Sequence, residues 1–414
     1  MTRTMPAAAH VDVKVKTPGT SSVTRIASID IIRALTMVLM IFVNDLGSLT
    51  NIPLWMQHVK PGVDGIGLAD VVFPAFLFIV GLSLPFAISN RRNKGDSDLQ
   101  LCKHILSRTV ALLVMGVFLV NGETIHASAT GLPRYMWNPL CCMAFIITWN
   151  NYPARFNRRK VLAFRAAGIL ILALLAFMYR GGKAGEVYRF SQHWWGILGL
   201  IGWAYLASAL ITVFSRGRFL PLMFGWLFFC LLSIIYKAKL LHTGALQPYI
   251  PEAILGGTLT ALTMGGVLTS WVFSHYQQKG NNMRMTVVFV LSALVLIAMS
   301  VYTRGFWGLA KLGATPAWLF LCSAITLLAF TIIYWTADVL GKAQWFNLIK
   351  PAGTDTLLCY LVPILVLFVL RTFRIHFPGF MLAGGLGLVK SFLFAMFCVW
   401  FTGVLNRAGT RLKL

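Results

Sequence analysis

The chain has 414 residues, of which 58% are hydrophobic and 12% are charged, and its mean hydropathy is +0.75. This composition excludes a soluble globular domain and is typical of a membrane protein. The formal net charge of +24 does not indicate a nucleic-acid partner, because the basic residues form short clusters between apolar runs. The seven cysteines have no CxxC or CxxH spacing, so neither a disulfide framework nor a metal site is indicated.

The first residues are polar and contain no apolar core, so we expect no cleavable signal peptide and a disordered cytosolic tail over residues 1–27. Residues 28–414 are predicted to form one all-α domain, a polytopic membrane bundle of about 12 transmembrane helices. The expected spans are 31–49, 68–88, 105–120, 136–149, 161–178, 194–214, 219–236, 253–274, 286–303, 316–338, 355–373 and 387–405. The fourth span is the weakest, since its apolar stretch is short.

The basic residues predict the orientation of the bundle. Cytosolic loops carry an excess of Lys and Arg, and an inner N-terminus places 24 of the 36 such residues on the cytosolic side. Removing the span at 136–149 alone would move the basic cluster at 155–165 to the outer side. The charge pattern therefore favours an even number of spans, with both termini in the cytosol.

Polar side chains in and between the first two spans indicate a site. A charged residue at mid-bilayer costs roughly 2.5–3.5 kcal/mol or more, so such residues usually face a protein interior or a cavity. His58 lies in the outer loop between these spans, where an imidazole can take a proton or act as a nucleophile, unless it is simply solvated. Asp70 begins the second span, where a favourable charge at the helix N-terminus and a site role are both open.

Asn44 and Asp45 are adjacent near the outer end of the first span, about 20 Å along the helix from Asp30. The amide can donate to an oxyanion and the carboxylate can orient an imidazole. The alternative role for both is hydrogen bonding between helices. Asp30 and Arg33 have i,i+3 spacing at the inner end, which favours a structural ion pair over direct catalysis.

An inner basic cluster follows the second span. The excess of basic residues in cytosolic loops alone explains this cluster, although the same side chains could bind a phosphorylated cytosolic cofactor. Its members are Arg91, Arg92, Lys103 and Arg108. The chain has no GxxxxGK[ST], HExxH or GxSxG motif, so no motif supports nucleotide hydrolysis, zinc-peptidase or serine-hydrolase chemistry.

These residues together resemble the heparan-α-glucosaminide N-acetyltransferase family of transmembrane acyltransferases, including bacterial relatives that are labelled as a domain of unknown function. The specific block is Ser28-Ile-Asp30-x-x-Arg33, Phe42-Val43-Asn44, His58 and Ala69-Asp70-Val71-Val72-Phe73-Pro74-x-Phe76-Leu77-Phe78-Ile79-x-Gly81. Weaker likeness continues at Arg108 with Gly116, at 195–199, at 253–258 and at 353–357. Ala34 departs from the family's usual Gly and Asp355 from its usual Asn, and 136–178 looks like an inserted helical hairpin.

The resemblance implies a multi-pass protein of the bacterial inner membrane that transfers acetyl from cytosolic acetyl-CoA to an amino or hydroxyl group of a periplasmic sugar or glycan. By this resemblance His58 would be the general base and Asn44 would bind the thioester carbonyl. Asp45 or Asp70 would orient the imidazole. The inner cations, Arg33, Arg92 and Arg108 among them, would hold the phosphates of CoA.

Direct transfer and an acetyl-histidine intermediate both remain open, and a homodimer is compatible with the sequence. The alternative function is a secondary transporter of a small polar or sugar-like solute, since twelve spans with inner termini are common in that class. Against it, the connection between the sixth and seventh spans is only Ser215-Arg216-Gly217-Arg218, and matching broken helices in two halves are missing.

Overall fold

A computed structural model describes residues 26–183, 186–241, 250–412 and 414, and most of these residues are in helices. Most of the predicted tail at 1–27 lies outside them. The helices are α1 (Ala27–Asp45), α2 (Leu68–Arg92), α3 (Asp98–Asn121), α4 (Ala127–Thr130), α5 (Arg134–Trp149), α6 (Arg158–Met178), α7 (Ile197–Ser215), α8 (Phe219–Lys237), α9 (Glu252–Leu255), α10 (Thr258–Gln278), α11 (Asn282–Trp307), α12 (Pro316–Tyr334), α13 (Lys350–Thr354), α14 (Thr356–Thr372) and α15 (Gly384–Arg407). Two short strands, β1 (Gly181–Lys183) and β2 (Glu186–Tyr188), pair antiparallel. The predicted all-α class is confirmed for this part of the chain.

Each of the twelve predicted spans coincides with a helix, but fewer helices meet the requirements of a membrane span. Within the described residues, nine are long and apolar enough, and a tenth is obtained if the segments Ala343–Thr354 and Thr356–Thr372, bent by 80°, count as one. The remaining two are α5, which has 16 residues, and α10, which carries several Thr and Ser side chains. A multi-pass membrane protein follows from these helices, while the count of twelve stays a prediction.

The helix ends follow local sequence signals. Ser97 and Gln100 form a reciprocal capping box at the start of α3, with the Ser97 N–H donating to Gln100 Oε1 at 2.7 Å. Thr315 caps α12 and is followed by Pro316, whose missing N–H is not needed in the first turn. Each of these helices therefore begins at a cap formed by residues of its own flanking sequence.

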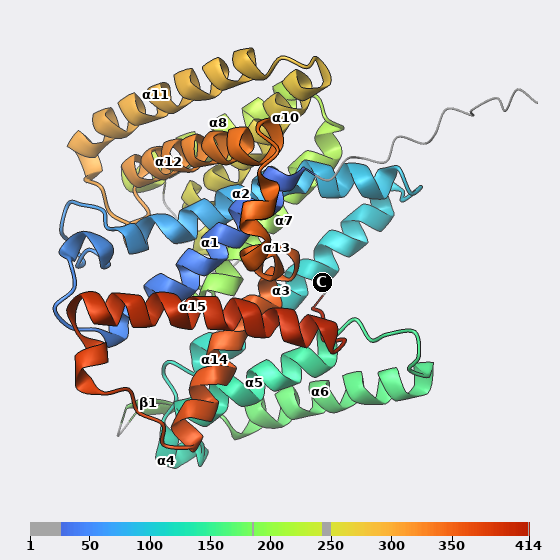
Figure 1. Ribbon diagram of the computed structural model, residues 1–414, viewed down its shortest axis with the longest axis vertical. Coiled ribbons are helices and arrows are strands. Elements are labelled where there is room, and N and C mark those ends of the chain that lie inside the picture. The colour runs from blue at the N-terminus through green and yellow to red at the C-terminus, as the bar shows by residue number, and fades with distance from the viewer. Residues whose placement is uncertain (1–25, 184–185, 242–249, 413) are drawn as a thin grey trace, which may run out of the picture.

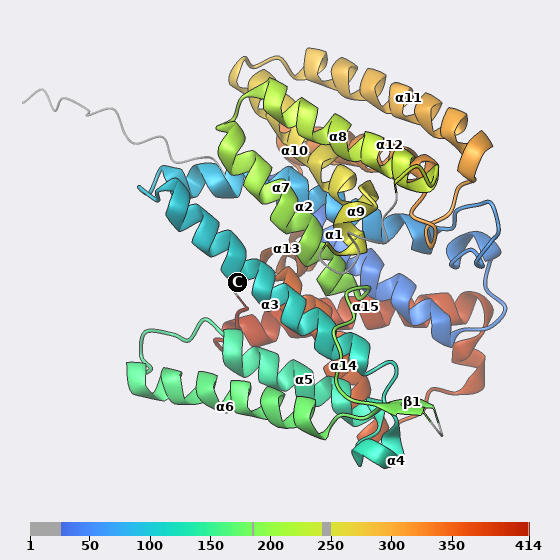
Figure 2. The same cartoon turned by 180° about the vertical axis from the view of Figure 1, so that it is seen from behind.

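The helices divide into a buried centre and an outer layer. In α1 and α12, 67% of the apolar window is buried within the protein, against 17% in α6 and 22% in α8. Figure 1 shows α11 along one edge of the bundle and the α5–α6 pair along the opposite edge, with α1 and α2 between them, and Figure 2 shows the same order from behind. The outer helices thus present apolar faces that a bilayer would cover.

The centre is held by a close crossing of α2 and α10. A Cβ atom added at Gly81 would collide with the carbonyl oxygen of Thr263, and one added at Gly266 would collide with that of Phe78. Small residues let two membrane helices approach to backbone contact, which gives van der Waals packing where lipid provides no hydrophobic driving force. This contact fixes α2, which carries residues of both ends of the candidate site.

The start of α1 and the end of α15 lie at the same end of the bundle, as both views show. The N–H groups of Ala27 and Ser28 donate to Asp338 at 3.1 and 3.0 Å, and the N–H of Leu412 donates to Asp355 at 3.0 Å. We call this the inner end, following the predicted orientation, and the end with the 46–67 loop the outer end. Which side of the membrane each end faces remains a prediction.

Candidate active site

His58 and Asp70 meet at the outer end, where the loop after α1 returns to the start of α2. His58 Nδ1 lies 2.7 Å from Asp70 Oδ1, and Asp70 Oδ2 accepts the N–H groups of Val59 at 3.0 Å and Gly67 at 3.2 Å. A Cβ on Gly67 would collide with the carbonyl oxygen of Gln57, so glycine is needed for the loop to close on itself. The Asp70 carboxylate is 4% exposed and the His58 ring 51% exposed. A buried carboxylate thus holds one ring nitrogen while the ring edge reaches solvent.

The structure adds Lys311, which the sequence analysis missed. Its Nζ lies 3.3 Å from His58 Nδ1 and 3.9 Å from Asp70 Oδ1, and its side chain is 23% exposed. The signal in the sequence was a single lysine in the predicted outer loop between two apolar spans, but spacing could not connect it with His58, 253 residues away. Burial lowers the pKa of Lys311, and the neighbouring Asp70 carboxylate raises it in part.

A second carboxylate ties this loop to the segment that carries Lys311. Asp64 accepts the N–H of Leu309 at 2.7 Å and pairs with Arg304 Nε at 3.0 Å, and the Gly65 N–H donates to the Leu309 carbonyl at 2.9 Å. The Leu309 N–H and the Arg304 guanidinium both lower the pKa of Asp64, with the backbone bond the larger cause. The two loops are therefore joined at a point two residues from Lys311.

Asp45 does not contact His58. Its Oδ2 accepts from Lys390 Nζ at 2.6 Å and from Ser391 Oγ at 2.6 Å, both on α15, and the ion pair is about nine-tenths buried. Asn44 is exposed on the last turn of α1, and its side chain makes no hydrogen bond with the described residues. Of the two carboxylates predicted to orient the imidazole, the structure brings Asp70 to it and joins Asp45 to α15 instead.

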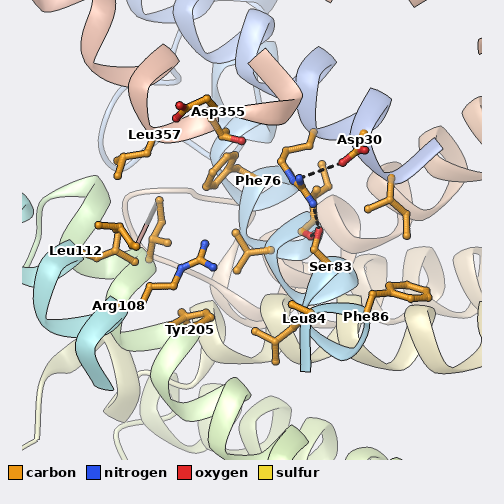
Figure 3. A pocket seen from close by; sticks show the side chains of 18 of the residues that line it. Asp30, Phe76, Ser83, Leu84, Phe86, Arg108, Leu112, Tyr205, Asp355 and Leu357 are labelled. Carbon is orange, nitrogen blue, oxygen red and sulfur yellow. Dashed lines mark hydrogen bonds and ion pairs between the residues drawn. The ribbon is translucent and has the colours of Figure 1, made fainter. Parts of the chain in front are cut away.

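A larger cavity, of about 760 Å³, opens at the inner end between α1, α2, α3, α7 and the start of α14. We call it the inner pocket. Arg108 lies over the ring of Tyr205, 4.8 Å from its centroid, and its buried Nε has no hydrogen-bond partner within the described part of the chain. Figure 3 shows this guanidinium beside Tyr205, facing the space that Asp30 and Ser83 border from the other side.

Arg33 also lines the inner pocket, and it makes the predicted ion pair with Asp30 at 3.3 Å. It donates as well to Ser83 Oγ at 2.6 Å and to the Gly353 carbonyl at 3.1 Å, so it joins α1, α2 and α13. Arg91 reaches the same pocket. Arg92 does not line it, because it binds Asp98 at 2.8 Å and the Val213 carbonyl at 2.7 Å. Of the three predicted cofactor-binding arginines, the structure brings Arg33 and Arg108 together and separates Arg92.

The inner pocket and the His58 site both have residues on α2. The pocket is lined from Arg91 to Phe76, which is about 22 Å of helix, and Asp70 lies about 9 Å further at 1.5 Å per residue. The cationic groups border its inner part, and Met40 and Phe76 are among the apolar residues that line its deeper part.

A smaller cavity of about 390 Å³ lies at the outer end, and His58 is not among the residues that line it. Its lining includes Val59, Asp70, Lys311 and Trp307. We call it the outer pocket. An indole and several polar groups around a concave surface are typical of a small-molecule site.

Comparisons with known proteins give the family of this chain. The family model described as "Domain of unknown function (DUF5009)" matches residues 25–248, more than half of the chain, so the chain belongs to this family. It is 36% identical over 120 residues to heparan-alpha-glucosaminide N-acetyltransferase of Mus musculus, and 33% identical over 117 residues to that of Homo sapiens. The matches cover 29% and 28% of this chain, and 16% and 15% of those relatives. The resemblance inferred from the residues is confirmed over this limited stretch.

Proposed function

For this member of the DUF5009 family we propose a transmembrane acetyltransferase that moves acetyl from acetyl-CoA at the inner end to an amino or hydroxyl group of a sugar at the outer end. The observation that carries the proposal is the contact between His58 and the buried Asp70, in a chain similar to an N-acetyltransferase. A base oriented by a carboxylate is the arrangement that removes a proton from an attacking nucleophile.

The inner pocket supports acetyl-CoA as the donor. Arg33, Arg91 and Arg108 would hold its phosphates by charge-assisted hydrogen bonds, and the buried unpaired Nε of Arg108 is a donor that such a ligand would satisfy. The apolar lining near Phe76 suits the uncharged arm that carries the thioester. The arm would then extend along α2 toward Asp70 and His58.

In the proposed reaction the acceptor binds at the outer end with its amine or hydroxyl against Nε2 of the half-exposed His58 ring. Asp70 accepts the hydrogen on Nδ1, which leaves the lone pair on Nε2 for the acceptor's proton. The nitrogen or oxygen of the acceptor forms a bond with the acetyl carbon, the thioester bond breaks, and the thiolate of CoA leaves and takes up a proton. Asn44 is retained as the candidate donor to the thioester carbonyl, at the outer end of α1.

The membrane and the acceptor also belong to this proposal, with the bacterial inner membrane as the location and the periplasm as the acceptor's side. The test supplies labelled acetyl-CoA to inside-out vesicles that contain candidate aminosugars in their lumen. Labelled acetyl-sugar in the lumen supports the proposal. Release of sugar from the lumen without any acetylated product would instead support the transporter, and absence of both would refute the two functions together.

A further inference from the structure

Lys311 has a place in the outer site but no role in the reaction as proposed above. Its Nζ lies 3.3 Å from His58 Nδ1, 3.9 Å from Asp70 Oδ1 and 3.5 Å from the carbonyl oxygen of Ala69. It therefore lies on the Asp70 side of the imidazole, away from Nε2. A group in this position acts on the ring and not on the acceptor.

The two neighbours of Nδ1 favour opposite states of the ring. A carboxylate at hydrogen-bond distance favours the imidazolium, and an imidazolium has no lone pair with which to accept a proton. An ammonium at 3.3 Å disfavours the imidazolium by like-charge repulsion. Since the carboxylate is buried, its charge is weakly screened by water, and a compensating cation has a correspondingly large effect.

We propose that Lys311 is a positioning residue that offsets the charge of Asp70 and so keeps His58 neutral. The Asp70 contact, at 2.7 Å shorter than the 3.3 Å contact of Lys311, keeps the hydrogen on Nδ1 and the lone pair on Nε2. The effect of Lys311 on the ring is independent of the proposed function. Only the use of the Nε2 lone pair for catalysis rests on the proposed function. The Asp70 contact then supplies orientation, and Lys311 prevents the same contact from leaving the base protonated.

Other charged groups around His58 do not replace Lys311. Lys60 and Lys237 line the outer pocket, and neither makes a hydrogen bond or ion pair with His58 in the described structure. Asp64 and Arg304 neutralise each other in their own ion pair. Cys322, buried on α12, interacts electrostatically with both Asp70 and Lys311, and a thiol adds no charge at neutral pH.

The test measures the protonation of His58 directly. Diethyl pyrocarbonate modifies neutral imidazole, and the half-exposed His58 ring is within its reach. The extent of modification of the His58 peptide is measured by mass spectrometry from pH 5 to pH 9 in the purified full chain. The variants are Lys311→Met, Lys311→Gln, which keeps a donor for Ala69, and Lys311→Arg, which keeps the charge. Lys239→Met is the matched control, because Lys239 is an exposed lysine that does not line the outer pocket.

The midpoint of modification should move to higher pH by about one unit or more in Lys311→Met and Lys311→Gln, the usual effect of one charge at this distance. It should stay within a few tenths of a unit in Lys311→Arg and Lys239→Met. Lys311→Gln decides the question if Lys311→Met does not give a monodisperse protein. An unchanged midpoint in the uncharged variants, or an equal shift in the control, would overturn the inference.

Acetyl transfer is measured in parallel to separate the two proposals. If the proposed function is right, the rate of Lys311→Gln should fall roughly tenfold for each unit of that shift at pH values below the wild-type midpoint, and should recover as the pH is raised. A purely structural role would lower the rate by the same factor at every pH. Failure of all variants and the wild type to acetylate any sugar would refute the proposed function, while the modification midpoint would still test Lys311.

Discussion

Asp70→Asn is the sharpest test of the outer site, because the two oxygens of this carboxylate have separate partners. Oδ2 accepts the N–H groups of Val59 and Gly67, and Oδ1 contacts His58 Nδ1. An asparagine of the same shape can keep its one oxygen on the two backbone N–H groups. Its NH₂ group then replaces Oδ1 and donates to Nδ1. The imidazole must accept there, so its hydrogen moves to Nε2.

The substitution therefore preserves the loop and reverses the tautomer. Had both backbone donors lost their acceptor, the cost would be about 1–3 kcal/mol each, and the fold would suffer visibly. With them satisfied, we expect thermal unfolding of the purified protein close to that of wild type. The acetyl-transfer rate should fall by about 10²–10⁴-fold, the loss associated with a wrongly protonated catalytic histidine.

The assay is labelled acetyl transfer at saturating acetyl-CoA, with protein level and unfolding temperature measured on the same preparation. Asp64→Asn is the matched control, a carboxylate on the same loop that binds Leu309 and Arg304 but not His58. It should keep activity within a few-fold of wild type. If Asp70→Asn were equally active, Asp70 would be a helix-start charge alone, and the orienting role assigned to it here would be wrong.

Three further predictions follow from the two ends of the bundle. His58→Ala should reduce acetyl transfer by about 10²–10⁴-fold while acetyl-CoA binding survives, measured by transfer assay and by equilibrium binding; a rate within a few-fold of wild type would contradict a catalytic His58. Arg108→Ala should raise the KM for acetyl-CoA more than it lowers kcat, because the guanidinium is assigned to the phosphates. An unchanged KM at normal expression would mean that Arg108 contributes only to the positive charge of the inner side. Single cysteines at positions 94 and 158 should resist labelling from the periplasm in intact cells, and strong labelling at either would overturn the orientation.

The sequence predicted the helices well because the bilayer imposes a simple requirement on composition and length. The sequence could not predict which individual segments would depart from this requirement. The chain breaks between α13 and α14, where Asp355 ends one helix and caps the next with a bond to the Leu358 N–H at 3.3 Å. The helix α10 is polar enough to fall short of a membrane span, yet it crosses α2 at the centre through Gly81 and Gly266. Tertiary packing decides both features.

The sequence named His58 and Asp70, which the structure brings into contact, but it did not single out this pair. The sequence offered Asp45 and Asp70 as equal candidates to orient His58, since both are carboxylates at about the same expected depth. They differ in what packs beside them. α15 brings Lys390 to Asp45, and the 308–315 loop brings Lys311 to Asp70 and His58. Both lysines come from segments more than 240 residues away, and no local spacing rule connects them.

The arrangement of the two pockets gives α2 a mechanical role in the proposed reaction. One continuous helix, in backbone contact with α10, carries Arg91 and Ser83 at the inner pocket and Asp70 at the outer site. The separation of the donor's charged head from the acceptor's base is then set by the length of a single element. A reaction that joins a donor from one side of the membrane to an acceptor on the other needs such a fixed distance, because misplacement of the reacting groups by about 1 Å can cost about 100-fold in rate. A transporter that alternates its access has no comparable need, since its site must open to each side in turn.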